Sequence, residues 1–260
     1  MSWFDGGVNL TDPRLDADAV IAEACSAEVT RLCVITTEPS EWDRARALHQ
    51  AYPEHICYTL GIHPHNAKNA TDADFARLRT LLSEPGVVAV GECGLDFNRN
   101  FSPPDVQQSV FQQQLAIAAD CGLPVYLHER DAIDTQMSCL SPYLASLSGG
   151  IAHCFTQGAD ALRRYLDCGL YIGITGWVCD PKRGDALRAC LADIPSDRLI
   201  LETDAPYLFP KTAKPRRRNN SPALIPHIGE QVSTILSQPA DLIRKTSYAN
   251  ACRLFGIEKA

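Results

Sequence analysis

The sequence lacks any apolar run that approaches the roughly 20 residues needed by a membrane-spanning helix. It also shows no basic segment followed by an apolar one at its start, where residues 1–5 (Met-Ser-Trp-Phe-Asp) lead directly into a strand-like segment. Both absences argue against a membrane-inserted or secreted protein. We therefore expect the protein to be cytoplasmic.

The eleven cysteines include no Cys-x-x-Cys pair, and their number is odd. This pattern argues against a disulfide framework. Cys33 and Cys57 lie inside apolar strand-like runs, where a free thiol behaves as a small apolar side chain. Cys93, Cys154 and Cys179 lie beside candidate site residues, and we expect them to be spectators rather than nucleophiles.

Positive charge is also scarce, because 24 Lys and Arg face 31 Asp and Glu and leave a formal net charge of −7. A protein that coats duplex nucleic acid uses many basic contacts to replace condensed counterions, so this balance argues against such a protein. It remains compatible with an enzyme that holds a few phosphates in a cleft. The densest basic segment is Arg-Arg-Arg at 216–218.

Short apolar segments rich in β-forming residues alternate with longer helical patterns along the whole chain. Several of them are apolar on both faces, which is typical of parallel strands that are covered on both sides. The expected strands are 3–9, 31–36, 56–61, 87–92, 124–128, 150–154, 170–175 and 198–203. Eight strand–helix units in 260 residues predict one α/β domain over 1–260, a (β/α)8 TIM barrel.

The clearest helical pattern covers 104–121, where Val110, Leu115 and Ala118 belong to an apolar stripe. The alternative of a doubly wound open sheet would call for a glycine-rich phosphate loop after the first strand, and Asp-Gly-Gly-Val-Asn at 5–9 does not match one. The segment 209–222 is rich in Pro, Arg and Asn and is expected to be a long loop after the eighth strand.

Ionisable residues occur where the expected strands end, in one strand after another. They are His63 and His65 after the third strand, Glu92 at the fourth, His128 at the fifth, His153 at the sixth and Asp204 after the eighth. In a barrel the carboxyl ends of the strands converge on one mouth, where active sites are built. Histidines combined with carboxylates favour a divalent metal site, and such a metal activates water and polarises a phosphoryl or carbonyl oxygen.

Five ordered motifs resemble those of the TatD family of nucleases, and the resemblance covers essentially the whole chain. They are Gly61-Ile-His-Pro-His65, Gly91-Glu-Cys-Gly-Leu-Asp96, Leu127-His-Glu-Arg130, Ile151-Ala-His-Cys-Phe155 and Glu202-Thr-Asp-Ala-Pro-Tyr207. The resemblance implies a cytoplasmic, magnesium-dependent nuclease that removes nucleotides from the 3′ end of single-stranded DNA or RNA, in DNA repair or nucleic-acid turnover.

The same resemblance implies roles for individual residues. It makes Glu92, His128, His153 and Asp204 the residues of the metal site, with Asp204 near both the metal and the attacking water. His63 and His65 correspond to positions close to the substrate phosphate and the metal, so the catalytic set is Asp204, His63, His65 and Glu92. Mg²⁺ is the expected ion, although imidazole ligands also suit Mn²⁺ or Zn²⁺.

One departure from the family pattern concerns the first strand. Many members carry two histidines in an Asp-x-His-x-His motif, whereas this chain has Gly7 and Asn9 at those positions. Glycine cannot bind a metal and an Asn carbonyl is a weak ligand. We therefore expect one well-held metal, with any second ion weak and bridged by substrate.

Substrate-binding residues are expected at the strand ends and in the loop after the eighth strand. Candidates for phosphate contacts are Arg130, Arg217, Arg218 and Asn220, and candidates for stacking on bases are Trp177 and Tyr207. Two alternatives stay open: Arg130 forms a salt bridge with Asp131 or Asp134, and 216–218 is only a solvated basic loop.

Three other functions compete with the nuclease. A related barrel could act on a C–N bond as an amidohydrolase, but those enzymes typically use the histidine pair that is missing here. Hydrolysis of an aminoacyl-tRNA ester is a narrower alternative. A non-catalytic nucleic-acid-binding module is the third. We expect a monomer that acts on a single-stranded nucleic acid and does not bind membranes.

Overall fold

The computed structural model describes residues 2–258. The chain separates into two compact units, which we call the terminal unit (residues 1–34 and 154–260) and the central unit (residues 35–153). The single domain over 1–260 stays a prediction.

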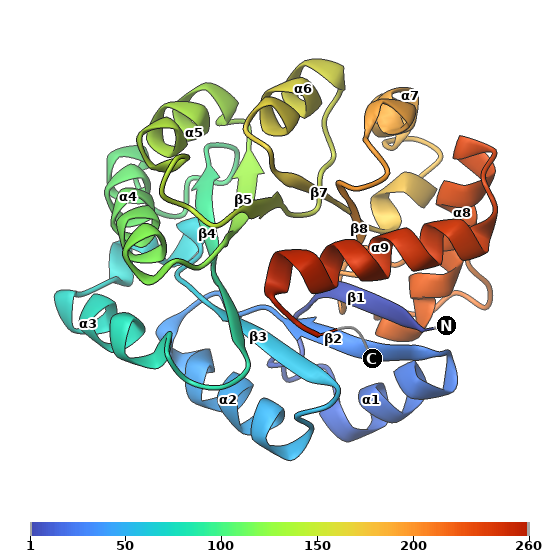
Figure 1. Cartoon of the computed structure of the whole chain (residues 1–260), viewed down its shortest axis with the longest axis horizontal. Coiled ribbons are helices and arrows are strands. Elements are labelled where there is room, and N and C mark those ends of the chain that lie inside the picture. The colour runs from blue at the N-terminus through green and yellow to red at the C-terminus, as the bar shows by residue number, and fades with distance from the viewer. Residues whose placement is uncertain (1, 259–260) are drawn as a thin grey trace. The chain divides into compact units, whose positions relative to one another are not determined.

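The central unit contains four strands that pair in parallel and in chain order. They are β3 (Ile56–Leu60), β4 (Val87–Asp96), β5 (Val125–Arg130) and β6 (Gly150–Ala152). Its helices lie along the outer side of these strands in Figure 1, and they are α2 (Trp42–Ala51), α3 (Asp72–Leu81), α4 (Pro104–Cys121) and α5 (Ile133–Leu140). A 3₁₀ helix, η2 (Pro64–Asn69), follows β3 and carries His65.

The terminal unit contains two parallel strand pairs. They are β1 (Trp3–Val8) with β2 (Val29–Val34), and β7 (Tyr171–Ile174) with β8 (Leu199–Leu201). A bridge between Val8 and Ala205 joins the end of β1 to the segment after β8. The helices are α1 (Ala17–Ser26), α6 (Ala159–Asp167), α7 (Asp185–Cys190), α8 (Ile225–Leu236) and α9 (Ala240–Phe255), and α9 lies across β1 and β8 (Figure 1).

The eight expected strands are all present, and the helix expected at 104–121 has those bounds. Pro104 begins α4 because a proline fits the first helical turn, where no helical hydrogen bond to its nitrogen is needed. Gly122 ends the helix with a φ of 66°, a conformation that glycine adopts at no steric cost. Val110, Leu115 and Ala118 are buried, as the apolar stripe predicts.

Strands β4 and β5 extend further than expected, so Glu92 and His128 lie within strands and not at their ends. In the β4–β5 ladder Gly91 pairs with Tyr126 and Cys93 pairs with Leu127, which leaves Glu92 as an additional residue between them. This is a β-bulge, a feature that redirects a side chain and is common beside active sites. A Cβ at Gly91 would lie 2.3 Å from the carbonyl oxygen of Tyr126, so the bulge requires glycine there.

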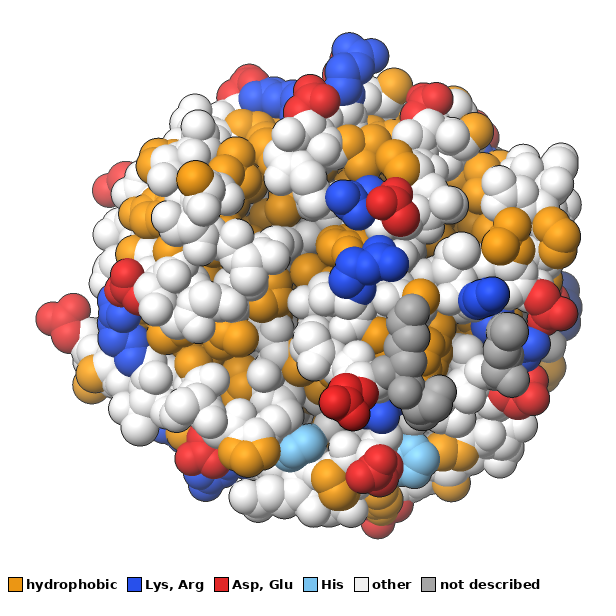
Figure 2. All heavy atoms as spheres, viewed as in Figure 1, with side chains coloured by type: hydrophobic (Ala, Val, Ile, Leu, Met, Phe, Trp, Pro, Cys, Tyr) orange, Lys and Arg blue, Asp and Glu red, His pale blue; other side chains and the backbone are white. Residues whose placement is uncertain are grey.

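All eleven cysteines lie in the described part of the chain and are free thiols, as expected. Within residues 2–258 no helix is long and apolar enough to span a membrane. On the face drawn in Figure 2 the acidic and basic side chains are interspersed, which agrees with the absence of a broad basic face there.

Candidate metal and catalytic site

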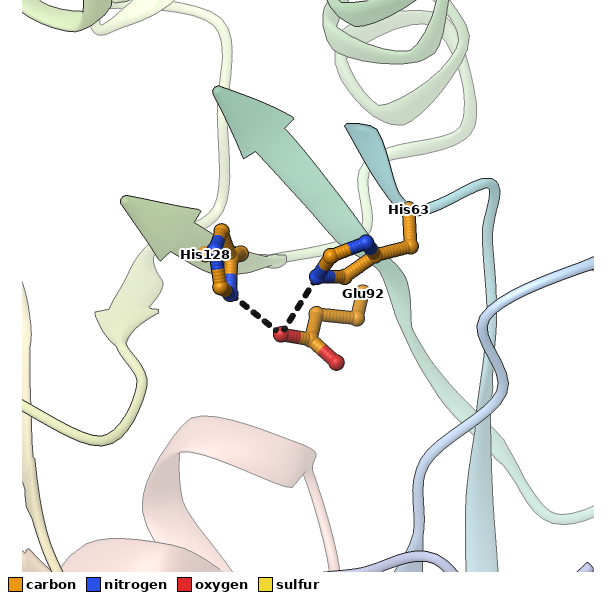
Figure 3. A group of neighbouring side chains, drawn as sticks. All are labelled: His63, Glu92 and His128. Atoms are coloured by element: carbon orange, nitrogen blue, oxygen red, sulfur yellow. Dashed lines mark hydrogen bonds and ion pairs between the residues drawn. The ribbon is translucent and has the colours of Figure 1, made fainter. Parts of the chain in front are cut away.

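Three histidines of the central unit face one carboxylate oxygen, Oε1 of Glu92 (Figure 3 shows two of them). His128 Nδ1 lies 2.9 Å from this oxygen, His63 Nε2 lies 3.5 Å from it and His153 Nε2 lies 4.0 Å from it. Glu92, His63 and His153 are buried. The bulge in β4 therefore directs the glutamate to a point on which β3, β5 and β6 also converge.

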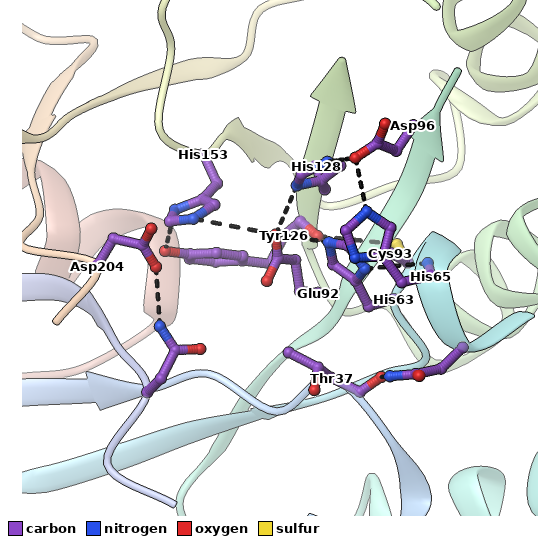
Figure 4. A network of polar contacts seen from close by, with 12 residues as sticks. Thr37, His63, His65, Glu92, Cys93, Asp96, Tyr126, His128, His153 and Asp204 are labelled. Carbon is purple, nitrogen blue, oxygen red and sulfur yellow. Dashed lines mark hydrogen bonds and ion pairs between the residues drawn. The ribbon is translucent and has the colours of Figure 1, made fainter. Parts of the chain in front are cut away.

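Asp96 forms a second layer around this cluster, between His65 and His128 (Figure 4). Its Oδ2 atom lies 2.7 Å from His65 Nε2 and 3.4 Å from His128 Nε2. Burial by itself lowers the pKa of His128, but its hydrogen bonds to Asp96 and Glu92 outweigh burial and raise that pKa to about 9. Although burial alone would raise the pKa of each of these two carboxylates, their histidine neighbours hold both pKa values below the usual range.

The hydrogen bonds of His63 determine which of its nitrogens carries the proton. Its Nδ1 accepts a hydrogen bond from the backbone N–H of His65 over 3.1 Å. Burial and the neighbouring His128 lower the pKa of His63 to about 3, so the ring is neutral near pH 7. A neutral ring that accepts at Nδ1 has its proton on Nε2. His63 therefore presents an N–H donor to the cluster, which suits contact with a phosphate oxygen better than metal ligation.

In His153, unlike His63, the contact at Nδ1 allows the proton to lie on Nδ1 and leaves Nε2 unprotonated. Its Nδ1 lies 2.8 Å from the hydroxyl oxygen of Tyr126, a fully buried side chain on β5. If Nδ1–H donates to this oxygen, Nε2 keeps its lone pair on the side of Glu92. Metal-binding histidines usually donate their other N–H in this way, which fixes the ring orientation.

The residues of this cluster have the chemistry of a divalent metal site. One side-chain atom each of His63, Glu92 and His128 lies within 4.8 Å of the others, so Glu92 and His128 can hold an ion beside the N–H of His63. Imidazole and carboxylate ligands together suit Mg²⁺, Mn²⁺ or Zn²⁺. His128 lies on β5, which pairs with β4, and His153 lies just after β6, which pairs with β5.

Asp204 lies in the terminal unit, three residues after β8, with a φ of 54°. Its backbone N–H donates to the carbonyl of Gly7 over 2.9 Å. Its Oδ1 accepts a hydrogen bond from Asn9 Nδ2 over 2.8 Å, and the same amide group lies 3.3 Å from the carbonyl oxygen of Ala205. Asp204 Oδ1 and the carbonyl oxygen of Ala205 are both acceptors, so the amide nitrogen of Asn9 faces them. Asn9 thereby holds the carboxylate of Asp204 in place.

Thr203, the residue before Asp204, belongs to a buried network of hydrogen bonds. The carboxylate of Asp5 accepts hydrogen bonds from the backbone N–H and the hydroxyl of Thr203. Burial raises the pKa of Asp5 to about 7, although these hydrogen bonds oppose the shift. Asn220 is also buried and donates its amide to the carbonyl of Thr203 over 2.8 Å. Asn220, expected to contact substrate, thus tethers the loop after β8 to the residue before Asp204.

Glu202 is fully buried in the terminal unit and accepts a hydrogen bond from the backbone N–H of Cys154 over 2.9 Å. A Cβ at Gly173 would lie 2.1 Å from Oε2 of Glu202, so the glutamate occupies the space that any other residue at 173 would need. Glu202 is therefore packed against Gly173 and hydrogen-bonded to the backbone of Cys154 within this unit.

The three cysteines beside site residues have buried or hydrogen-bonded thiols. Burial raises the pKa of Cys93 well above its usual range and that of Cys179 to about 11. Cys154 Sγ lies 3.5 Å from the hydroxyl oxygen of Thr175 and offers a ligand atom within 4.8 Å of one on Asp204. Thiols at raised pKa are poor nucleophiles near pH 7, which agrees with the spectator role expected for Cys93 and Cys179.

The other substrate candidates lie at exposed or half-buried positions. Arg130 is exposed at the end of β5, and Asp131, one of its expected salt-bridge partners, accepts a hydrogen bond from Asn98 instead. Trp177 is half-buried, and the guanidinium of Arg183 lies 4.2 Å from its ring centroid.

The loop after β8 is tied to neighbouring residues of the terminal unit. Tyr207 is 48% exposed, and the guanidinium of Arg14 lies 4.6 Å from its ring centroid. Arg217 Nη1 lies 2.5 Å from Glu23 Oε1 on α1, whereas Arg218 is exposed. Arg218 thus has its charge at the surface, while Arg217 shares its charge with a glutamate.

Two residues of the site were not expected from the sequence as site residues, namely Asp96 and Tyr126. Tyr126 precedes His128 by two positions on β5, and alternate residues of a strand share a face. That spacing could have indicated that its hydroxyl reaches the cluster. Asp96 ends β4, which was expected to end at residue 92, so its distance from the expected strand end concealed it.

Comparisons with known proteins show which proteins this chain resembles. A 3′-5′ ssDNA/RNA exonuclease TatD from Enterobacter lignolyticus (strain SCF1) is 47% identical over 259 residues, which is 98% of this chain and 99% of that protein. The protein of the same name from Edwardsiella piscicida is 46% identical, over 97% and 98% of the two chains.

Among solved structures, YJJV, a TatD homologue from Escherichia coli K12, superposes with a TM-score of 0.90 at 28% identity over 98% of each chain. This likeness confirms the predicted (β/α)8 barrel fold. The sequence model of the TatD related DNase family matches residues 4–256. The chain therefore belongs to the TatD related DNase family.

Proposed function

We propose that this protein is a metal-dependent phosphodiesterase that removes nucleotides from the 3′ end of single-stranded DNA and RNA. Family membership and the names of the relatives support this activity. The observation that carries the proposal is the convergence of three imidazoles on Oε1 of Glu92, within a unit that also buries the polar groups supporting them.

Glu92, His128 and His153 would hold the metal, with Mg²⁺ as the expected ion and Mn²⁺ or Zn²⁺ as alternatives. A divalent ion in such a site supplies Lewis-acid polarisation of a phosphoryl oxygen and activation of a water molecule. Tyr126 fixes the ring of His153 through Nδ1, and Asp96 contacts the outer edge of His128. These contacts orient the ligands before an ion is bound.

The remaining catalytic roles follow from the hydrogen bonds of each side chain. His63 directs an N–H from Nε2 into the cluster and would donate it to a non-bridging phosphate oxygen. His65, held at Nε2 by Asp96, is available for the same phosphate or for the leaving oxygen. Asp204, steadied by Asn9, would accept a proton from the attacking water, a role suited to a positioned carboxylate.

Substrate contacts outside the cluster are assigned to exposed groups. Arg130 and Arg218 have exposed side chains that suit phosphate contacts, and Tyr207 and Trp177 offer aromatic rings to bases. Arg217 would contact a phosphate while it keeps or gives up its ion pair with Glu23. Asn220 would affect the substrate only indirectly, through its hydrogen bond to the carbonyl of Thr203. The monomeric state, the cytoplasmic location and the role in DNA repair stay predictions from the sequence.

Hydrolysis of end-labelled strands tests this proposal. Metal-stripped protein would be given Mg²⁺ or Mn²⁺ and single-stranded DNA or RNA labelled at the 5′ or 3′ end, in parallel with Glu92→Ala. Glu54→Ala, at an exposed turn of the central unit, is the matched control. We expect metal-dependent, stepwise shortening from the 3′ end by the unmodified chain and by Glu54→Ala, but none by Glu92→Ala.

Two outcomes would redirect the assignment. Release of product from an amide or an aminoacyl-tRNA ester, without cleavage of either polymer, would favour the amidohydrolase or ester hydrolase alternatives. Tight binding of single strands with no turnover under any metal would favour the non-catalytic binding module.

A further inference from the structure

Phe101 presents an exposed aromatic ring beside the candidate metal cluster. Its side chain is 54% exposed, more than that of any other large apolar residue in the described part of the chain. Its ring centroid lies 4.7 Å from that of His65 in an edge-to-face arrangement. His65 in turn contacts Asp96, so an exposed apolar ring lies two side chains away from the His128 edge of the cluster.

The segment before Phe101 is held in place by hydrogen bonds. Asp96 Oδ1 accepts from the backbone N–H groups of Asn98 and Arg99 over 3.0 and 2.8 Å. Asn100 has a φ of 49° and donates its side-chain amide to the carbonyl of Phe97 over 2.7 Å. Asn tolerates this left-handed conformation better than most residues, so the turn that presents Phe101 is fixed locally.

The residue after Phe101 is anchored as well. Ser102 is fully buried, and its hydroxyl donates to the carbonyl of His65 and accepts from the N–H of Lys68, both over 3.0 Å. Its carbonyl accepts a hydrogen bond from Gln107 Nε2 over 2.8 Å. The exposure of Phe101 therefore results from a preorganised loop that is fastened on both sides of the ring.

Two arginines belong to the segments next to Phe101. Arg99 belongs to the loop that carries Phe101, and Arg130 is the register partner of Asp96 in the β4–β5 ladder. The backbone N–H of Phe97 donates to the carbonyl of Arg130 over 2.9 Å, so the two segments are adjacent. Both arginine side chains are exposed in a protein whose net charge is −7. An exposed aromatic ring in a loop that also carries an exposed arginine, next to a strand end that carries another, suits a nucleotide, which has a flat base and an anionic phosphate.

We propose that Phe101 is a stacking platform for an unpaired nucleobase next to the scissile phosphate, with Arg99 and Arg130 contacting the adjacent phosphates. The proposal rests on the nuclease function above and extends it with a subsite for the single strand. A base inside a duplex is paired and stacked on both faces, so it cannot lie on this ring, whereas an unpaired base can. The platform would therefore favour single strands without selecting among the bases, because every base has a π-face.

Binding of a labelled strand tests the platform directly. The Glu92→Gln variant would be used with Mg²⁺ to suppress cleavage, and the affinity for a 5′-fluorescein-labelled ten-nucleotide DNA strand would be measured by anisotropy. Phe101→Ala, added to this background, should weaken binding about 10-fold, which is in the range reported for the loss of one base–aromatic contact. Phe101→Tyr should bind within about twofold of the reference, because it keeps the ring.

Abasic strands separate stacking from any structural effect. An abasic site at one of the two nucleotides flanking the scissile bond should weaken binding to the reference, and Phe101→Ala should then cause no further loss. Leu242→Ala, at an exposed apolar position on α9, is the surface control and should bind as the reference does. Equal loss by Phe101→Ala on intact and abasic strands, or no loss on either, would overturn the platform.

The outcomes also distinguish this proposal from the nuclease function itself. If the unmodified chain shortens single strands and Phe101→Ala in the Glu92→Gln background binds them as the reference does, the nuclease stands and the platform is wrong. If the unmodified chain neither cleaves nor binds them, both proposals are wrong.

Discussion

Asn9 donates a hydrogen bond from its side-chain amide to Oδ1 of Asp204 over 2.8 Å. The Asp-x-His-x-His pattern of many family members has a histidine for a second metal ion where this chain has Asn9. In this chain the side chain at position 9 instead donates a hydrogen bond to the carboxylate of Asp204. The terminal unit thus holds Asp204 from three directions, through Asn9, Gly7 and the bridge at Ala205.

Loss of the Asn9 amide should reduce turnover more than metal affinity. We expect Asn9→Ala to lower kcat about 10-fold, because Asp204 would lose the donor that orients its carboxylate. The affinity for Mn²⁺, measured by titration calorimetry, should change less than about threefold, since the Asn9 amide donates to Asp204 and Ala205 and Asn9 is not one of the proposed metal ligands. A loss of Mn²⁺ affinity that matches the loss of kcat would contradict this assignment.

Asp204→Asn tests the proton acceptor. The substitution keeps the shape of the side chain but removes its basicity, so we expect kcat to fall by about 10²- to 10⁴-fold, as is usual when a general base is removed. Metal binding should be largely preserved, and calorimetry with Mn²⁺ would check it. Near-normal turnover by this variant would show that another group accepts the proton.

Tyr126→Phe tests the orientation of His153. The hydroxyl of Tyr126 contacts Nδ1 of His153, and removal of such an outer contact typically lowers metal affinity about 10- to 100-fold. Tyr58→Phe is a matched control, because Tyr58 is a buried tyrosine of β3 whose hydroxyl has no partner among the described residues. Tyr58→Phe should leave Mn²⁺ affinity unchanged. Equal effects of the two substitutions would point to a general effect of losing a buried hydroxyl.

The buried carboxyl of Asp5 should make stability depend on pH. Its pKa in the folded chain is raised to about 7, above the ordinary value of 3.8, so the folded state binds a proton that the unfolded state releases. The protonated carboxyl of Asp5 therefore adds its full contribution to the free energy of unfolding when the pH is below the pKa of Asp5 in the unfolded chain. This contribution declines as the pH rises from about 4 to about 7, by up to about 1.4 kcal/mol per pH unit. Urea unfolding of metal-stripped protein should show this decline, and Asp5→Asn should remove it. Parallel pH profiles for the two chains would refute the role of Asp5.

The sequence predicted the strands well because parallel strands that are covered on both sides appear as apolar runs, and all eight are found. The helix at 104–121 was predicted to the residue because Pro104 and Gly122 mark its ends chemically. Strand lengths near the site were predicted less well. β4 continues through the polar residue Glu92 to Asp96, and a β-bulge produces no periodic signal in a single sequence.

The convergence of Glu92, His63, His128 and His153 could be predicted because each was expected near the carboxyl end of its strand, although Glu92 and His128 prove to lie within longer strands. The supporting hydrogen bonds could not, since they depend on side-chain directions. Asn220 illustrates this difference: its position in a basic loop suggested phosphate contact, whereas it is buried against Thr203. Phe101 was likewise not recognised, because only the fold shows that the residues on either side of it are anchored.

The close approach of Glu202 to Gly173 links two positions that are 29 residues apart in the sequence. If residue 173 alone were varied in a mutant library and folded variants were selected, glycine would be retained, because any larger residue would overlap the side chain of Glu202. A library that varied both positions together would allow larger residues at 173 only where residue 202 had become smaller. These two positions are therefore expected to show strong pairwise epistasis, and divergent homologues should change them as a pair.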